Sequence, residues 1–246
     1  MRITVLGACG AYPEAGESCS GYLFEADGFR LVVDLGYATM PRLLESVPAE
    51  QVDAVYVSHG HPDHCVDLNP LLRARALRDE PAPPLPVYAP PGALDAVLRL
   101  DRPAMLADAY ELHEFQVGSR WEIGPFGVDT RLLPHFLTNA AVRLTAAGRS
   151  VVYTGDGGPS PDLVDLARDA DLLIAEASFA DQVPEDNLGQ LSSARDAGRQ
   201  AAQAGVGGLL LTHLMHRVDP PLAAHFAAKE YAGGIGVAKA GLTSDL

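Results

Sequence analysis

The sequence contains little cysteine, few basic residues and no long hydrophobic run. Its 3 cysteines, Cys9, Cys19 and Cys65, form no paired framework, which favours a reducing cytoplasm over a disulfide-rich secreted environment. Lysine and arginine number 18 against 32 acidic residues, and the net charge of −14 disfavours binding to nucleic acid and to anionic membranes. No segment approaches the ~20 apolar residues that a membrane-spanning helix needs. We therefore expect a cytoplasmic protein without a membrane partner.

The residues that are plentiful predict an α/β fold. Hydrophobic residues make up 48% of the 246 positions, which is enough for a substantial core. Short apolar runs typical of β-strands alternate with helical segments, among them a helix predicted over 94–100 and a last strand over 235–239. Length alone allows one large domain or two small ones. The proline-rich stretch 81–86 leads directly into another predicted strand, so we expect a single domain over 1–246.

One stretch, residues 58–64, concentrates the polar chemistry of the chain. It reads Ser-His-Gly-His-Pro-Asp-His and follows the apolar run 54–57, which is typical of a buried strand. Its glycine and proline break regular structure, so we expect the functional side chains to lie on a loop at the carboxyl end of that strand. Imidazole suits zinc, and a carboxylate adds a hard, negatively charged ligand. The stretch therefore predicts a metal site that includes His59, His61, Asp63 and His64.

Three further side chains of this kind follow predicted strands elsewhere in the chain, namely His135, Asp156 and His213. Each is weak evidence alone, because a single histidine at a strand end is more often a hydrogen-bonded core residue. Strand ends at one edge of a sheet sandwich converge, and together the seven side chains suffice for two metal ions with an aspartate between them. Asp34 also ends a predicted strand. It could orient a ligand histidine or simply cap a turn, and the sequence leaves both interpretations open.

The run from His59 to His64, taken with the three later residues, resembles the metallo-β-lactamase fold superfamily over nearly the whole chain. Within it the sequence is most similar to the phosphodiesterase branch that includes ribonuclease Z, the tRNA 3′-processing endonuclease. The resemblance implies a four-layer αβ/βα sandwich with a dinuclear site at one edge. It also implies a first metal ion held by His59, His61 and His135, a second held by Asp63, His64 and His213, and a bridge formed by Asp156. An aspartate instead of a cysteine at this bridge argues against a zinc β-lactamase.

Two departures from the ribonuclease Z pattern bear on the substrate. The tRNA-gripping arm of that enzyme is inserted between the third and fourth motifs, but here His135 and Asp156 are only 156 − 135 = 21 residues apart. With the acidic composition, this argues against tRNA as a partner and favours a small-molecule substrate. The branch also carries a phosphate-contacting histidine paired with the glutamate of the preceding strand. That glutamate corresponds to Glu176, but the histidine position corresponds to Gln190, which can donate a hydrogen bond but cannot deliver a proton as general acid.

The missing acid leaves two explanations. The leaving group is good enough to depart unaided, or another residue supplies the proton. His216 is a candidate because it is close in sequence to His213, although the sequence favours an exposed loop histidine without a catalytic role. In either case Glu176 could remain as a structural partner.

We expect a hydrolase in which two divalent metal ions, zinc first and manganese or iron as alternatives, hold a bridging hydroxide that attacks a small phosphodiester such as a cyclic nucleotide. Asp63 would orient that hydroxide or accept its proton. The same site could instead hydrolyse a carboxylic ester, a lactone or a thioester. A ribonuclease Z-type endonuclease and a metal-binding module without catalysis are further alternatives. The sequence is compatible with a homodimer and leaves the oligomeric state open.

Overall fold

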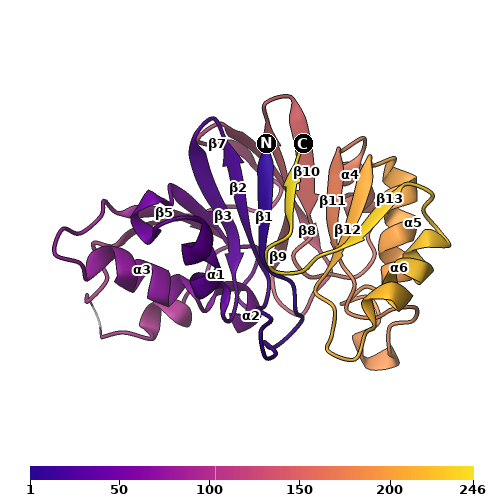
Figure 1. Ribbon diagram of the computed structural model, residues 1–246, viewed down its shortest axis with the longest axis horizontal. Helices are drawn as coiled ribbons and strands as arrows, with labels where there is room; N and C mark the ends of the chain where they lie inside the picture. Colours follow the sequence, from indigo (N-terminus) through magenta and orange to yellow (C-terminus); the bar gives the residue numbers. More distant parts are fainter. Residues whose placement is uncertain (103) are drawn as a thin grey trace.

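The computed structural model describes residues 1–102 and 104–246, which form two β-sheets packed face to face (Figure 1). The first sheet contains, in spatial order, β14 (Thr243–Asp245), β1 (Arg2–Gly7), β2 (Gly21–Ala26), β3 (Phe29–Leu35), β4 (Ala54–Tyr56), β5 (Leu85–Ala89) and β6 (Tyr110–Glu114). The second contains β13 (Gly234–Val237), β12 (Gly208–Thr212), β11 (Leu172–Glu176), β10 (Arg149–Tyr153), β9 (Asn139–Ala146), β8 (Phe126–Leu133) and β7 (Arg120–Ile123).

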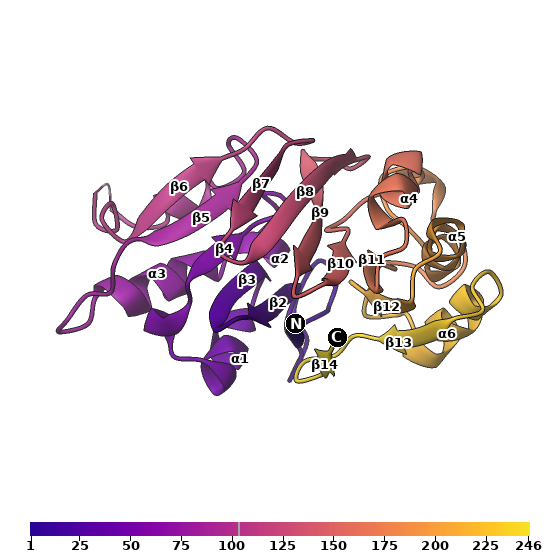
Figure 2. The same ribbon diagram turned by 90° about the horizontal axis from the view of Figure 1, so that it is seen from above.

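Helices cover the outer face of each sheet and complete the four layers (Figure 2). The first sheet is covered by α1 (Thr39–Ser46) and α3 (Leu68–Ala76), and the second by α4 (Pro161–Ala167), α5 (Ala194–Ala204) and α6 (Pro220–Ala228). Between the sheets lies an aromatic-rich core that includes Tyr22, Phe126 and Tyr153. The predicted α/β four-layer sandwich is confirmed.

The alternation of side chains along β3 explains how one strand serves two hydrophobic layers. Leu31 and Val33 pack into the core between the sheets, whereas Val32 packs toward the helices. The alternation ends at Asp34, whose φ of +56° lies in the left-handed region that non-glycine residues seldom adopt. That turn of the backbone brings a carboxylate to the end of the strand, inside the protein.

The parallel strands of the two sheets bring their carboxyl ends to one edge of the sandwich. In the first sheet β3, β4, β5 and β6 run parallel, and in the second β10, β11, β12 and β13 do so. The loops that follow β3, β4, β10 and β12 therefore meet, as they do in many α/β proteins whose sites lie beyond strand ends.

Three predicted details are wrong. Residues 62–65 form a one-turn helix, α2 (Pro62–Cys65), because proline suits the first position of a helix and does not break it there. The segment 94–100 contains turns and a short 3₁₀ helix (Val97–Arg99) instead of an α-helix. The strand predicted over 235–239 is present as β13, but it is not the last strand, because β14 follows it and pairs with β1 so that Arg2 lies opposite Asp245.

Two further short 3₁₀ helices complete the elements, at Ala49–Gln51 and Glu185–Asn187. Among the residues that the structure describes, every helix is too short or too polar to cross a membrane. The cytoplasmic location stays a prediction.

Candidate metal centre

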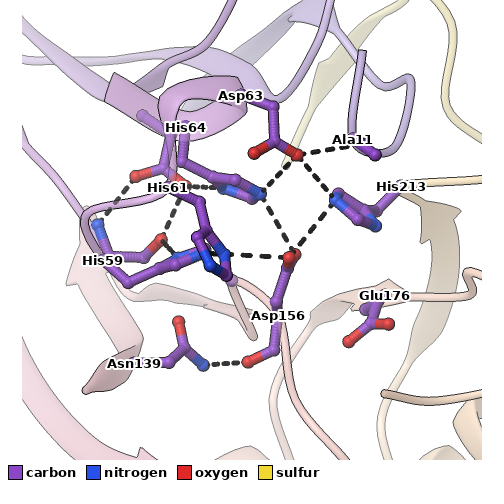
Figure 3. A network of polar contacts seen from close by, with 12 residues as sticks. Ala11, His59, His61, Asp63, His64, Asn139, Asp156, Glu176 and His213 are labelled. Atoms are coloured by element: carbon purple, nitrogen blue, oxygen red, sulfur yellow. Dashed lines mark hydrogen bonds and ion pairs between the residues drawn. The ribbon is translucent and has the colours of Figure 1, made fainter. Parts of the chain in front are cut away.

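The seven predicted metal-binding side chains converge at the carboxyl edge of the sheets (Figure 3). His59 and His61 lie on the turn after β4, and Asp63 and His64 lie on α2. The other three follow β8, β10 and β12 in the second sheet, namely His135, Asp156 and His213. The centre is thus built from both sheets.

Their ligand atoms form two groups that share one residue. The first group is His59, His61, His135 and Asp156, and the second is Asp63, His64, Asp156 and His213. Within each group the ligand atoms lie within 4.8 Å of one another. In Figure 3 the carboxylate of Asp156 points up between the imidazole rings of the two groups. Among the described residues, Asp156 is the one that belongs to both groups, and it could contact an ion in each.

In the first group, three ring nitrogens face one another at short distance. Nδ1 of His61 lies 3.0 Å from Nε2 of His59 and 3.1 Å from Nε2 of His135. Burial and the neighbouring imidazoles lower the pKa of His59, His61 and His135, and that of His59 is lowered well below its usual value. Neutral imidazoles keep the lone pairs that a metal ion requires.

The second group has stronger acidic character. Nε2 of His213 lies 3.2 Å from Oδ2 of Asp63 and 3.3 Å from Oδ2 of Asp156. Burial alone would lower the pKa of His64 and His213, but Asp156, together with Asp34 at His64 and Asp63 at His213, raises both. Against the effect of burial, these histidines lower the pKa of Asp63 and Asp156. Positive charge is thus favoured here, whether proton or metal ion.

The far nitrogens of four histidines are held by hydrogen bonds that fix their tautomers. His64 donates from Nδ1 to Asp34 at 2.7 Å, and His135 donates from Nδ1 to the carbonyl oxygen of Gln190 at 3.0 Å. Ser58 and Ser178 give their single protons to carboxylates, so they accept from Nδ1 of His59 and His213. In its neutral form each of these four rings therefore turns an unprotonated Nε2 toward the centre, which is the arrangement expected of metal ligands.

Two buried atoms of the centre show that the residues fit a metal ion. Nε2 of His64 and Oδ1 of Asp156 lie 3.1 Å apart, yet neither has a hydrogen-bond partner among the described residues. A buried polar atom without a partner costs free energy unless an ion or a water satisfies it. Imidazole nitrogens and carboxylate oxygens in two groups of four suit divalent transition metals.

Asp34 is linked by hydrogen bonds to a histidine of each group. The side chain is completely buried, and its Oδ2 accepts hydrogen bonds from His64, from the hydroxyl of Tyr153 and from the hydroxyl of Ser58. Because Ser58 in turn accepts from His59, one carboxylate orients a histidine of each group. Its contacts match the role of orienting ligand histidines, one of the two that the sequence left open.

We expect Asp34→Asn to weaken metal binding in both groups by about 10–100-fold. One carboxylate oxygen becomes an NH₂ group, which cannot accept the hydrogen bonds that His64, Tyr153 and Ser58 donate. Competition with a fluorescent zinc chelator measures the affinity. The control is Asp67→Asn, since Asp67 is a half-buried carboxylate that accepts from the backbone N–H of Met40 and belongs to neither group. Equal zinc affinity in the parent and in the Asp34 variant would contradict the orienting role.

Glu176 lies behind the second group as a buried anchor. Its carboxylate accepts from the backbone N–H groups of Gly157 and Ser192 and from the hydroxyl of Ser178, which also contacts His213. Burial and the nearby Asp156 carboxylate raise the pKa of Glu176 to about 8. These contacts tie together the loops after β10 and β11, which is the structural use expected for this residue.

Gln190 and His216, the two other candidate catalytic residues, lie in different surroundings. Gln190 is half-buried, and its backbone carbonyl, rather than its side chain, contacts His135. His216 lies on an exposed turn, where Nδ1 is 2.5 Å from the hydroxyl of Tyr12 and Nε2 accepts from Arg217. Both ring nitrogens of His216 are thus engaged outside the two groups.

Several residues of the centre were missed by sequence reasoning. The backbone N–H of Ala11 donates to Oδ2 of Asp63 at 2.9 Å, so the glycine-rich turn 7–16 supports the site. Gly10 allows this approach, because a Cβ there would lie 2.8 Å from the carbonyl oxygen of His213. Ser58 and Ser178 were also missed. Their signal is a small polar residue next to a strand end, which is too common to single them out.

Comparison with known proteins gives consistent matches. Residues 28–214 match the profile of the β-lactamase superfamily domain. The probable metallo-hydrolase YhfI of Bacillus subtilis is 34% identical over 248 residues, which cover 98% of each chain. Its crystal structure superposes with a TM-score of 0.90 at 33% identity, covering 99% of this chain and 98% of that one. The ribonuclease Z of Myxococcus xanthus is 28% identical over 302 residues, covering 100% of this chain and 98% of the relative.

Proposed function

This chain belongs to the β-lactamase superfamily, and from that membership and the geometry of its centre we propose a hydrolase that cleaves small phosphodiesters with two divalent metal ions. The observation that carries the proposal is the pair of four-residue groups that share Asp156. Two metal sites a few ångströms apart are typical of enzymes that hydrolyse phosphate esters.

We propose that His59, His61 and His135 would hold a first ion and Asp63, His64 and His213 a second, with Asp156 available to both groups. Zinc suits the five imidazoles best, with manganese and iron as alternatives. When bound, such a pair of ions supplies an activated water at neutral pH and offsets the charge that develops on the phosphate. The metal-facing nitrogens are held in place by the hydrogen bonds described above.

The protein's own residues orient the attacking water and hold the ligand histidines in place. Ala11 and His213 both contact Oδ2 of Asp63, which leaves Oδ1 to orient the attacking water or accept its proton. Ser58, Tyr153 and Asp34 hold the rings of His59 and His64 from below, so that little reorganisation is needed when substrate arrives. A phosphodiester is favoured over a carboxylic ester because the relative from Myxococcus xanthus is named as a ribonuclease.

The test combines elemental analysis with a substrate screen. We expect two metal ions per chain after reconstitution with zinc, and hydrolysis of bis(p-nitrophenyl) phosphate well above that of a lactone and a thioester. Faster cleavage of the lactone or the thioester would reassign the substrate class. Two bound ions with no hydrolysis of any substrate would support a metal-binding module, and fewer than one ion per chain would remove the dinuclear proposal.

The similarity to ribonuclease Z makes tRNA processing the second candidate function, and one feature separates it from the first. Residues 136–155 are all described and are occupied by β9, β10 and their short connections, so no arm lies between His135 and Asp156. With a net charge of −14, binding to precursor tRNA should be weak and should disappear at physiological salt. Filter binding across a salt series measures this, and submicromolar, salt-resistant binding would favour the second candidate.

A further inference from the structure

Asn139 is a completely buried amide next to the metal centre. It is the first residue of β9, and in Figure 3 it lies on the side of Asp156 that is opposite to the carboxylate. Nδ2 of Asn139 donates to the backbone carbonyl oxygen of Asp156, and also to that of Thr154 at 2.9 Å. One side chain thus holds the backbone from which the shared carboxylate projects.

The two carbonyl oxygens determine the orientation of this amide. Carbonyl oxygens only accept hydrogen bonds, so the atom that faces them must be the NH₂ group of Asn139. The other atom of the amide, Oδ1, has no hydrogen-bond partner among the residues that the structure describes. A buried acceptor without a partner costs free energy, so packing of the core does not account for an amide at this position.

Gly155 lets the amide approach the backbone beside Asp156 closely. Its φ is +59°, and a Cβ there would overlap Oδ1 of Asn139 and would lie 2.9 Å from the side chain of Ser58. Ser58 follows β4 in the first sheet, whereas Asn139 belongs to the second. The segment that leads into Asp156 is therefore packed between residues of both sheets and has little room to shift.

The next residue, Ala140, fastens the start of β9 to the first sheet. Its backbone N–H donates to the carbonyl oxygen of Ser58 at 3.0 Å, and its carbonyl oxygen accepts from the hydroxyl of Tyr56 at 2.9 Å. Ser58 directly precedes His59, a member of the first group. These contacts fix the start of β9, and with it Asn139, relative to the turn that carries His59.

Asn139 also closes the hairpin that carries His135. In the pairing of β8 with β9 it lies opposite Leu133, two residues before His135. Residues 139 and 140 therefore contact or flank the segments of three of the four members of the first group, namely His59, His135 and Asp156. Ligands that the fold holds in place before a metal ion arrives need little reorganisation when it binds.

We propose that Asn139 is a positioning residue that fixes the carboxylate of Asp156 relative to the histidines of the first group. Its bearing on hydrolysis rests on the proposed function, because the place of Asp156 matters there only through the metal ions. The role itself concerns metal binding, which can be measured without a substrate.

Asn139→Leu tests the role, because leucine keeps the approximate shape of the side chain and removes its N–H donors. We expect zinc binding to weaken about tenfold or more, as is typical when a residue that orients metal ligands is lost, and competition with a fluorescent chelator measures this. The visible absorption of the Co²⁺-loaded variant should also change, because it depends on the number and geometry of the ligands.

The matched control is Gln200→Met, which removes another buried amide of similar shape. Gln200 is 4% exposed, donates from Nε2 to the carbonyl oxygen of Ser160 at 3.0 Å and belongs to neither group. Its variant loses a buried hydrogen bond in the same way, but it should keep the zinc affinity and the Co²⁺ absorption of the parent. An equal loss of zinc affinity in Gln200→Met and in Asn139→Leu would overturn the proposal.

A second variant, Asn139→Ala, removes the donors without steric overlap and should show the same losses. Circular dichroism of the metal-free forms shows whether each variant folds. Parent-like zinc affinity and Co²⁺ absorption in a folded variant would overturn the proposal, and so would loss of the fold in both variants, because Asn139 would then serve stability. If the parent binds two ions and cleaves no substrate, the proposed function fails, while weaker zinc binding in these variants would still support the positioning role.

Discussion

Asp156→Ala should abolish hydrolysis and release at least one metal ion while the fold persists. Asp156 is the only residue common to the two groups, so its removal takes a ligand from both proposed ions at once. A bound metal ion supplies several kcal/mol of charge stabilisation, so we expect kcat/KM to fall about 10³-fold or more. Steady-state kinetics and metal content of the same preparation measure the two effects together.

Two further variants separate the bridge from general damage. Asp156→Asn keeps the shape of the side chain and removes its charge, and it should lose metal nearly as completely. Asp67→Asn removes another half-buried carboxylate that belongs to neither group, and it should keep both ions. If Asp156→Ala hydrolysed substrate at the parent rate, the bridging assignment would be wrong. Circular dichroism of each variant confirms that the fold is retained.

The placement of the seven side chains could be predicted because each follows an apolar strand. Strand ends at one edge of an α/β sandwich meet, so residues as distant as His59 and His213 needed only correct strand assignments to be brought together. Asp156 was expected between the two ions, and it is shared by both groups. The dense motif 59–64 fixed which edge of the first sheet to consider.

The supporting contacts could not be predicted because they depend on side-chain direction. The bonds from Ser58 to Asp34 and from Ser178 to Glu176 set histidine tautomers, yet a serine next to a strand end has no distinctive pattern. The backbone conformation at the strand ends could not be predicted from the sequence either. His213 adopts φ of +57°, which turns its ring toward the centre where a regular strand would have continued its alternation.

Which residue, if any, protonates the leaving group can be tested by comparing good and poor leaving groups. The structure reduces the number of candidate residues for this general acid. His216 has both ring nitrogens engaged by Tyr12 and Arg217, and the carboxylate of Glu176 accepts from three donors of the chain. Gln190 lies beside His135 through its own carbonyl, at the position where the family resemblance places a histidine. An enzyme without a positioned acid depends on leaving groups that are stable as anions.

Activated aryl phosphodiesters should therefore be cleaved much faster than alkyl ones by the parent enzyme. A positioned acid typically contributes ~10²–10⁴-fold, and we expect Gln190→His to recover at least about tenfold of this for alkyl esters while it changes aryl esters less than about twofold. The added imidazole must be protonated to act, so the gain should be greatest below its ordinary pKa of about 6.5 and should vanish as the pH rises. Measurement of kcat/KM for paired aryl and alkyl esters across pH tests both statements.

The matched control is Gln203→His, which adds the same imidazole to an exposed position on α5. It should leave the ratio of aryl to alkyl rates unchanged at every pH. If Gln190→His changed both ester classes equally, or neither, the side chain at 190 would not reach the leaving group. In that case another residue would supply the proton, or the leaving group would depart without one.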